Sequence, residues 1–255
     1  MRLLNQFFKV SILVLFFSTM TFAQEEQQAP MYVIHTDHVN FNKMAQYEQV
    51  AKELKDNCVK HNVKDANWLT VTAEDGRYMY VSEIKNMAEL DQNWMAELFE
   101  KMGKDAASAM LTKMDECYDK HGSEILHYIP SLSYNPEGYS RDGMNFREYH
   151  FLYYHPENGK ALGDAMEKIK KMFEDKGVKN GYNVYHSGFG SDESYFIVAI
   201  AGKNSLHVAQ TGEENDKLLG DEREAVFFEM IQLASRYDQV NGEIRPDLSY
   251  APQEE

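Results

Sequence analysis

The stretch PSLSYNP (residues 130–136) recurs near the C-terminus as PDLSYAP (residues 246–252). The match extends upstream, where YDKHGSEI (118–125) corresponds to YDQVNGEI (237–244). Further matches follow in the same order, at a nearly constant offset of about half the chain. That period is far longer than the 20–50 residues of solenoid repeats, so the sequence predicts a duplicated domain.

Two Gly/Asn exchanges between the copies support a shared backbone. Asn62 in the first copy corresponds to Gly177 in the second, and Gly122 corresponds to Asn241. These residue types accept the left-handed conformation that ends many helices. We therefore expect a helix end at each of the four positions.

Each copy shows the pattern strand, helix, strand, strand, helix, strand. In the first copy a β-rich segment precedes apolar positions spaced by three or four, and the turn Glu74–Gly76 joins two further strands. A helical region over 87–120, interrupted near Gly103, and a last strand complete it. The second copy repeats this order, with a polar loop expected over 210–220. A helix follows, with Asp221 and Glu224 as its capping pair.

This βαββαβ order is the ferredoxin-like unit, whose sheet carries helices on one face only. Two such units can bury their bare sheet faces against each other, which predicts an α+β, pseudo-symmetric barrel packed sheet-to-sheet. In each Leu-Ser-Tyr motif the Leu and Tyr point to one side of an extended segment. We expect each motif to be an arm that packs against the other copy. We expect repeat 1 over 31–136, a linker of breaker residues over 137–146, and repeat 2 over 147–252.

In element order and duplication the chain resembles the dimeric α+β barrel superfamily in its fused, two-repeat form. That superfamily includes antibiotic-biosynthesis monooxygenase-like, NIPSNAP-like and haem-binding chlorite dismutase-like proteins. The resemblance covers residues 31–252 but rests on no catalytic motif. It implies a cofactor-independent monooxygenase as one function and a haem protein as another, with His186 or His207 as the axial ligand.

The N-terminus has the three parts of a secretory signal peptide: Arg2 and Lys9, an apolar run over 10–17, and small residues ending at Ala23. We expect cleavage after residue 23, a disordered segment over 24–30, and an exported protein, periplasmic or secreted. Cleavage would change the formal net charge from −15 to −17. Such an acidic surface argues against nucleic-acid partners, and no stable membrane anchor is expected. A homo-oligomer remains open.

Four residues are the candidates for binding a ligand: His38, His155, Tyr80 and Tyr153. The two histidines end the first strand of each copy, and tyrosines are abundant in the predicted strands. A cavity lined with such side chains suits a small, partly apolar or aromatic molecule. The alternative is that the histidines bond to loop carbonyls and the tyrosines fill the core.

Cys58 and Cys117 lie near the ends of two helices that share one face of repeat 1, so in an exported chain they are candidates for a disulfide. Two separate buried thiols are the alternative. No metal site is expected. His35 and Asp37 share one strand face, but no further His or Cys stands at a spacing typical of ligands. The second copy has Leu152 and Tyr154 at the corresponding positions.

The sequence leaves two functions from different classes open. The first is an accessory or binding protein whose cavity holds a small molecule without a cofactor. The second is a monooxygenase-like enzyme that uses a strand His or Tyr on an aromatic substrate. The binding protein is favoured because no nucleophile, metal set or acid–base pair stands out, and haem remains the third alternative.

Overall fold

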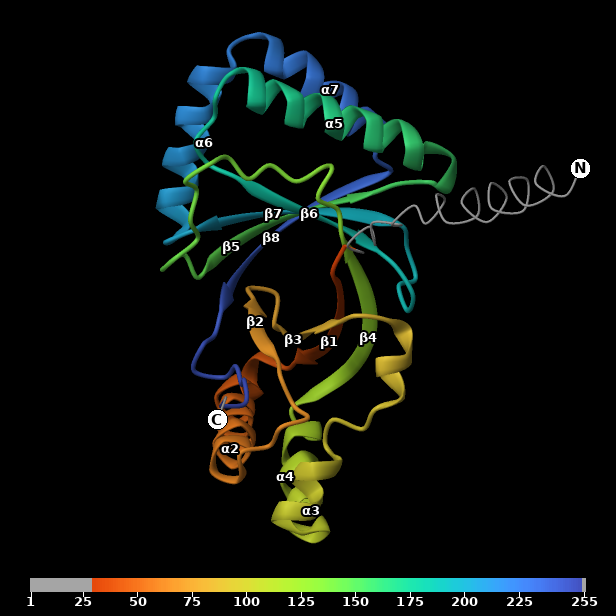
Figure 1. Cartoon of the computed structure of the whole chain (residues 1–255), viewed down its shortest axis with the longest axis vertical. Helices are drawn as coiled ribbons and strands as arrows, with labels where there is room; N and C mark the ends of the chain where they lie inside the picture. The colour runs from red at the N-terminus through yellow and green to blue at the C-terminus, as the bar shows by residue number, and fades with distance from the viewer. Residues whose placement is uncertain (1–28, 254–255) are drawn as a thin grey trace, which may run out of the picture.

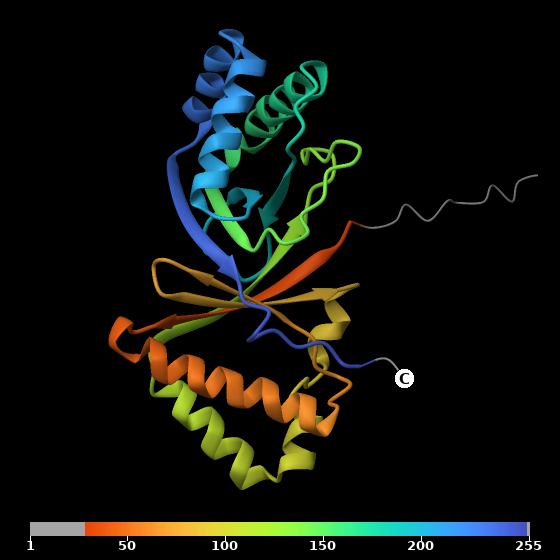
Figure 2. The same cartoon turned by 90° about the vertical axis from the view of Figure 1, so that its left-hand side faces the viewer.

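The computed structural model describes residues 29–253, and the expected signal peptide lies outside this range. The chain forms a closed β barrel between two layers of helices (Figure 1). The helices of repeat 1 cover one side of the barrel, and those of repeat 2 cover the opposite side (Figure 2). Within residues 29–253, no helix is both long and apolar enough to cross a bilayer.

Repeat 1 follows the predicted order, with a different boundary before its last strand. Helix α2 ends at Asn62 in the left-handed conformation (φ 46°), and Gly103 (φ 84°) interrupts the second helical region, both as expected. That region ends at Asp115 instead of residue 120, so Gly122 lies inside a strand, not at a helix end. The elements are β1 (Met31–Val39), η1 (Phe41–Lys43), α2 (Met44–His61), β2 (Leu69–Ala73), β3 (Arg77–Ile84), η2 (Met87–Asp91), α3 (Ala96–Met102), α4 (Lys104–Asp115) and β4 (Tyr118–Tyr128).

Repeat 2 has the same order, but the loop expected over 210–220 is a helix. The Asn204 side chain caps this helix, and Val208 and Leu219 are buried near its two ends, so its polar middle faces solvent. The next helix begins after Asp221, whose side chain forms no capping bond. The elements are β5 (Phe146–Tyr153), η3 (Pro156–Asn158), α5 (Gly159–Asp175), β6 (Tyr182–Ser187), β7 (Tyr195–Gly202), α6 (Ser205–Leu219), α7 (Glu222–Leu233) and β8 (Arg236–Ile244).

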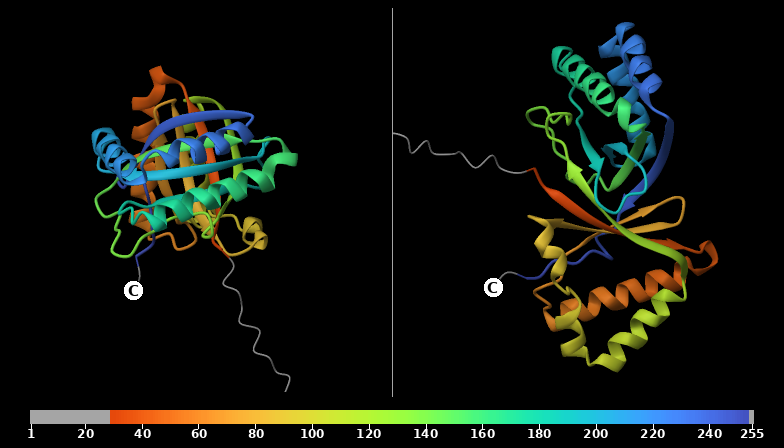
Figure 3. Two further views of the ribbon diagram at one scale, coloured as in Figure 1. Left: turned by 90° about the horizontal axis from the view of Figure 1, so that it is seen from above. Right: turned by 90° about the vertical axis from the view of Figure 1, so that its right-hand side faces the viewer.

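The barrel order is β1-β3-β2-β8-β5-β7-β6-β4, and every neighbouring pair is antiparallel. Each repeat contributes one four-stranded ferredoxin-like sheet. The last strand of each sheet pairs with the second strand of the other, as in β2·β8 and β4·β6. The sheet-to-sheet packing is therefore confirmed, and the two sheets lie together between the helical layers (Figure 3). Hydrogen bonds also join the two sheets at both edges.

Four apolar cores hold this arrangement together, the smallest of them formed by Met31, Val33, Ile84 and Ile125. The first lies between α2, α3, α4 and the outer face of the repeat 1 sheet, and the second lies between the helices and sheet of repeat 2. The third fills part of the barrel interior. Side chains of each strand alternate between the outer, helix-covered face and the interior, as strand geometry requires.

Cys58 and Cys117 are both fully buried in the repeat 1 core, and both are free thiols. The expected disulfide is therefore wrong for this structure. The Cys117 thiol instead donates to the carbonyl of Lys113 at 3.3 Å, and burial raises the pKa of Cys58 to about 11. Both side chains serve as small apolar core residues.

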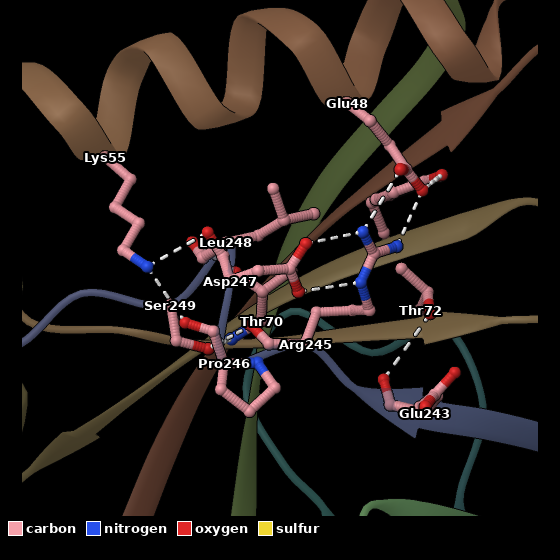
Figure 4. Close-up of polar contacts among 11 residues, drawn as sticks. Glu48, Lys55, Thr70, Thr72, Glu243, Arg245, Pro246, Asp247, Leu248 and Ser249 are labelled. Atoms are coloured by element: carbon pink, nitrogen blue, oxygen red, sulfur yellow. Dashed lines mark hydrogen bonds and ion pairs between the residues drawn. The ribbon is translucent and has the colours of Figure 1, made fainter.

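The C-terminal arm packs against repeat 1, as predicted. Leu248 and Tyr250 are buried in the repeat 1 core, and the Tyr250 hydroxyl donates to the carbonyl of Val63 at 2.8 Å. Arg245 forms an ion pair with Glu48 on α2 at 2.6 Å (Figure 4). The last residues of the described chain thus complete the first repeat.

The first arm makes the reciprocal contact. Leu132 and Tyr134 are buried in the repeat 2 core, and the Tyr134 hydroxyl donates to the carbonyl of Val178 at 2.6 Å. Tyr134 also forms a β-bridge with Tyr182 at the start of β6. Each repeat therefore contributes its arm to the core of the other.

Candidate functional site

The barrel interior contains a cavity of about 280 Å³. Inward-facing side chains from all eight strands line it, and residues of the third core form its apolar wall. Eight-stranded barrels of this kind are wide enough to hold one small ligand. The middle of the cavity is apolar, being lined by Ile34, Val71, Met79, Val81, Leu126 and Ile197.

Two arginines line one end of this cavity, where β1 and β5 begin. Arg147 donates to the carbonyls of its own turn, including that of Phe146 at 2.9 Å. Arg141, from the segment between the repeats, donates to the side-chain oxygen of Asn183 at 2.8 Å. Burial lowers the pKa of Arg147, and the nearby charge of Arg141 lowers it further. An arginine nevertheless stays protonated in proteins, so this end of the cavity is cationic.

The two arginines are exceptional in this chain because they have no carboxylate partner. Within residues 29–253, every other arginine forms an ion pair with an Asp or Glu; these are Arg77, Arg223, Arg236 and Arg245. Arg141 and Arg147 form none, although the chain carries a formal net charge of −15. Their guanidinium groups are bonded to neutral oxygens only.

Tyrosines surround the cationic end. The rings of Tyr32 and Tyr185 meet edge to face at 5.9 Å, and Tyr149 also lines the cavity. Burial raises the pKa of Tyr32 to about 12 and raises the pKa of Tyr149 as well, so both hydroxyls remain neutral. They can therefore donate hydrogen bonds to an anion while their rings contact an aromatic body.

The opposite end of the cavity opens into a surface hollow that shares Arg77 and Phe151 with it. His38 and Tyr153 line this mouth. Burial, followed by the charges of Lys120 and Arg77, lowers the pKa of His38, so its ring is neutral at neutral pH. The guanidinium of the neighbouring Arg236 lies 3.6 Å from the centre of the Tyr153 ring.

The structure brings two of the four proposed ligand-binding residues together. His38 and Tyr153 both line the mouth of the barrel. Tyr80 faces the other side of its sheet, where its hydroxyl bonds to that of Tyr47 at 2.9 Å. His155 is exposed after the end of β5. No sequence pattern pointed to Arg141 or Arg147, because only the folded barrel shows that neither meets a carboxylate.

A second cavity, of about 330 Å³, lies between the sheet of repeat 2 and helices α5, α6 and α7. Its wall is mostly apolar, with Glu148, His150 and Tyr237 among its polar residues. His150 bonds to the Glu148 carboxylate at 2.9 Å through Nε2 and to the Tyr237 hydroxyl at 2.6 Å through Nδ1. A histidine held by a carboxylate has the arrangement of a general base.

The two histidines suggested as axial ligands, His186 and His207, do not fit a haem in either cavity. His186 lines neither cavity, and its Nε2 is bonded to the Tyr154 hydroxyl at 2.6 Å. His207 has a buried Nδ1 without a partner in the described chain, but this atom lies beside the position that a Cβ on Gly202 would occupy, and His207 lines neither cavity. His150 does line a cavity, but both of its ring nitrogens are bonded. Neither cavity thus has a ring nitrogen directed at a site for iron.

Neither a scan of protein-family models nor a search of curated proteins gave a match. Among solved structures, an anthrone oxidase-like protein is similar, with 10% identity and a TM-score of 0.53, over 87% of this chain and 92% of that chain. A chlorite dismutase variant from Candidatus Nitrospira defluvii has 8% identity and a TM-score of 0.49, over 86% of this chain and 93% of that one. The chain therefore has the dimeric α+β barrel fold, with both halves in one polypeptide.

Proposed function

We propose that this chain is a binding protein that holds a small aromatic anion inside its barrel. The observation that carries this proposal is the pair Arg141 and Arg147, which lack carboxylate partners and line a cavity built mostly from aromatic and aliphatic side chains. The one carboxylate that the described residues place in its wall, that of Glu124, accepts a hydrogen bond from the Tyr195 hydroxyl at 2.6 Å. Both arginines are partly buried, and a charge withdrawn from water is costly unless it is paired. A ligand carboxylate would provide the missing partner.

The cavity restricts the ligand in size and chemistry. Its volume of about 280 Å³ is near the lower end for small-molecule sites, which suits one or two aromatic rings. Arginine can bind a carboxylate through two parallel hydrogen bonds, which fixes the orientation of the ligand. The acidic surface repels anions at long range, so the two arginines would select a ligand by local contact.

A matched ligand pair tests the charge requirement. The intrinsically fluorescent 1-naphthoate carries a carboxylate, and 1-naphthamide is its neutral counterpart of similar shape. We expect the wild-type protein to bind 1-naphthoate more tightly than 1-naphthamide. Losing a charge-assisted hydrogen bond costs about 1.5–3 kcal/mol, so Arg147→Gln should weaken 1-naphthoate binding by roughly 10- to 150-fold. Arg141→Gln should weaken it in the same direction.

Arg223→Gln is the control, because this arginine lies on α7 and pairs with Asp216 outside the barrel cavity. It should leave 1-naphthoate binding unchanged. Equal affinity of the wild-type protein for the acid and the amide would refute the proposal. So would tight binding of 1-naphthoate that survives both barrel substitutions.

The second candidate function is a monooxygenase-like enzyme, and the Glu148–His150 pair beside the helix-side cavity favours it. The similar anthrone oxidase-like structure makes anthrone the appropriate probe. Such an enzyme should consume oxygen with anthrone, and His150→Ala should abolish this activity without lowering the melting temperature. His155→Ala serves as the exposed control. If oxygen uptake with anthrone does not exceed the rate in buffer alone, anthrone is excluded as a substrate of such an enzyme.

We also propose that the protein is exported, on the strength of the N-terminal signal pattern alone. Cell fractionation of the natural host should place the mature chain outside the cytoplasm. N-terminal sequencing of that material should begin at Gln24. Full-length chain in the cytoplasm would contradict the proposal.

A further inference from the structure

A cluster of two histidines and one aspartate lies on the outer face of the barrel, away from both proposed ligand sites. His35 and Asp37 are two residues apart on β1, so their side chains share one face of the strand. In the antiparallel pairing of β1 with β4, Asp37 lies directly opposite His121. One ligand atom from each of the three side chains lies within 4.8 Å of the others.

The carboxylate of Asp37 is held in a fixed orientation. Its side chain is only 3% exposed, and one oxygen accepts a 2.5 Å hydrogen bond from the hydroxyl of Tyr47 on α2. The other oxygen faces the Nε2 of His35 at 3.1 Å. Within residues 29–253, no Lys or Arg forms an ion pair with this buried carboxylate, whose neighbours are the Tyr47 hydroxyl and the His35 ring. A metal cation beside it would therefore be favourable.

Neighbouring side chains hold His35 in place, whereas His121 is exposed. The Nδ1 of His35 bonds to the hydroxyl of Ser123 at 2.9 Å, which leaves Nε2 directed toward the cluster. Metal-binding histidines typically have their second nitrogen held in this way by an outer partner. The ring of His121 meets that of His35 edge to face, with centres 5.5 Å apart. His121 is exposed, so its ring can rotate without disturbing the core.

We propose that His35, Asp37 and His121 form a binding site for a divalent transition-metal ion, with zinc as its first candidate. Two imidazoles and one carboxylate are a common donor set for Zn²⁺, at bond lengths of about 2.0–2.2 Å. Tetrahedral coordination would bring the donor atoms to roughly 3.4 Å from one another, which a rotation of the exposed His121 ring supplies. The fourth position would face solvent and hold water or an external ligand.

This site is independent of the ligand cavity, because it lies on the opposite face of β1 from Ile34 and Thr36. Tyr47 links the site to Tyr80 through a hydrogen bond of 2.9 Å. Tyr80, which the sequence suggested as a ligand-binding residue, instead lies in the shell around the metal ligands. It would stabilise the orientation of Tyr47 and, through it, that of Asp37.

Isothermal titration of the untagged mature protein with zinc tests the proposal. The wild-type protein should bind one zinc ion per chain, and His35→Ala and His121→Ala should each weaken binding at least tenfold. His155→Ala, which removes an exposed histidine elsewhere, should bind zinc like the wild type. Melting temperatures measured without metal show whether each variant is folded, and His121→Gln replaces His121→Ala if the latter is not.

Cobalt provides a second readout. Tetrahedral Co²⁺ with nitrogen and oxygen ligands absorbs strongly in the visible, whereas octahedral, hydrated Co²⁺ absorbs only weakly. We expect these bands for the wild type and their loss in His121→Ala. The proposal is overturned if the wild type shows no saturable zinc binding. It is equally overturned if the folded His121 variant binds zinc with unchanged affinity.

Discussion

Replacing Leu248 by Ala tests the packing of the C-terminal arm most directly. The side chain is 1% exposed and lies in the core of repeat 1, although it follows the last strand of repeat 2. The substitution removes three buried carbon groups, worth about 2.4 kcal/mol at roughly 0.8 kcal/mol each. The cavity left behind adds to this, so we expect a loss of about 3–4 kcal/mol in the free energy of unfolding.

Urea unfolding followed by tryptophan fluorescence measures this loss, because the Trp68 indole donates to the carbonyl of Leu248 at 2.9 Å and so reports on the arm. The matched control is Leu206→Ala, since Leu206 is 64% exposed on α6. This control should change stability by no more than about 0.5 kcal/mol. Far-UV circular dichroism should give the same single transition, because the paired edges join the two repeats.

Two results would refute this reasoning. A loss below about 1 kcal/mol for Leu248→Ala would mean that the arm contributes little to the repeat 1 core. Separate transitions by fluorescence and circular dichroism would mean that the repeats unfold independently, despite their shared edges and exchanged arms.

Three further predictions concern buried groups. Both cysteines, including Cys58 with its raised pKa, should react with a thiol reagent only after unfolding, as absorbance of the released thiolate would show. Burial lowers the pKa of His38 and of His186, so the unfolded chain binds protons more readily. The free energy of unfolding should therefore be at its full value above about pH 6.5 and fall as the pH decreases through the lower pKa values of the folded state. In urea titrations, His186→Gln should reduce this dependence of the free energy of unfolding on pH. Tyr134→Phe leaves the buried carbonyl of Val178 without its hydroxyl donor and should cost about 1–3 kcal/mol by the same method.

The fold could be predicted from the sequence because two signals agreed. The duplication fixed the number of units, and the order of strand and helix patterns fixed the unit. The arms followed from Leu and Tyr recurring at a spacing of two between prolines. The errors arose where local pattern was weak: the polar surface of α6 resembles a loop, and Gly122 in β4 resembles a helix end.

The sites could be predicted only in part. His38 was recognisable as a strand-end residue and Tyr153 as one of the strand tyrosines, and both line the barrel mouth. Arg147 has no carboxylate partner, and this depends on distances across the barrel that no local sequence pattern predicts. His121 joins His35 and Asp37 through the register of two strands far apart in sequence, and register is set by the whole sheet. The expected disulfide is not formed, because both cysteines are buried as free thiols that serve as apolar core residues.

The presence of both halves in one polypeptide has a consequence for how this molecule can specialise. In an assembly of two identical subunits, any substitution occurs at both symmetry-related positions. In this chain the halves can diverge, so His35 and Asp37 occur on one strand while Leu152 and Tyr154 occupy the corresponding positions on the other. One half can acquire new chemistry while its counterpart keeps the shared scaffold intact.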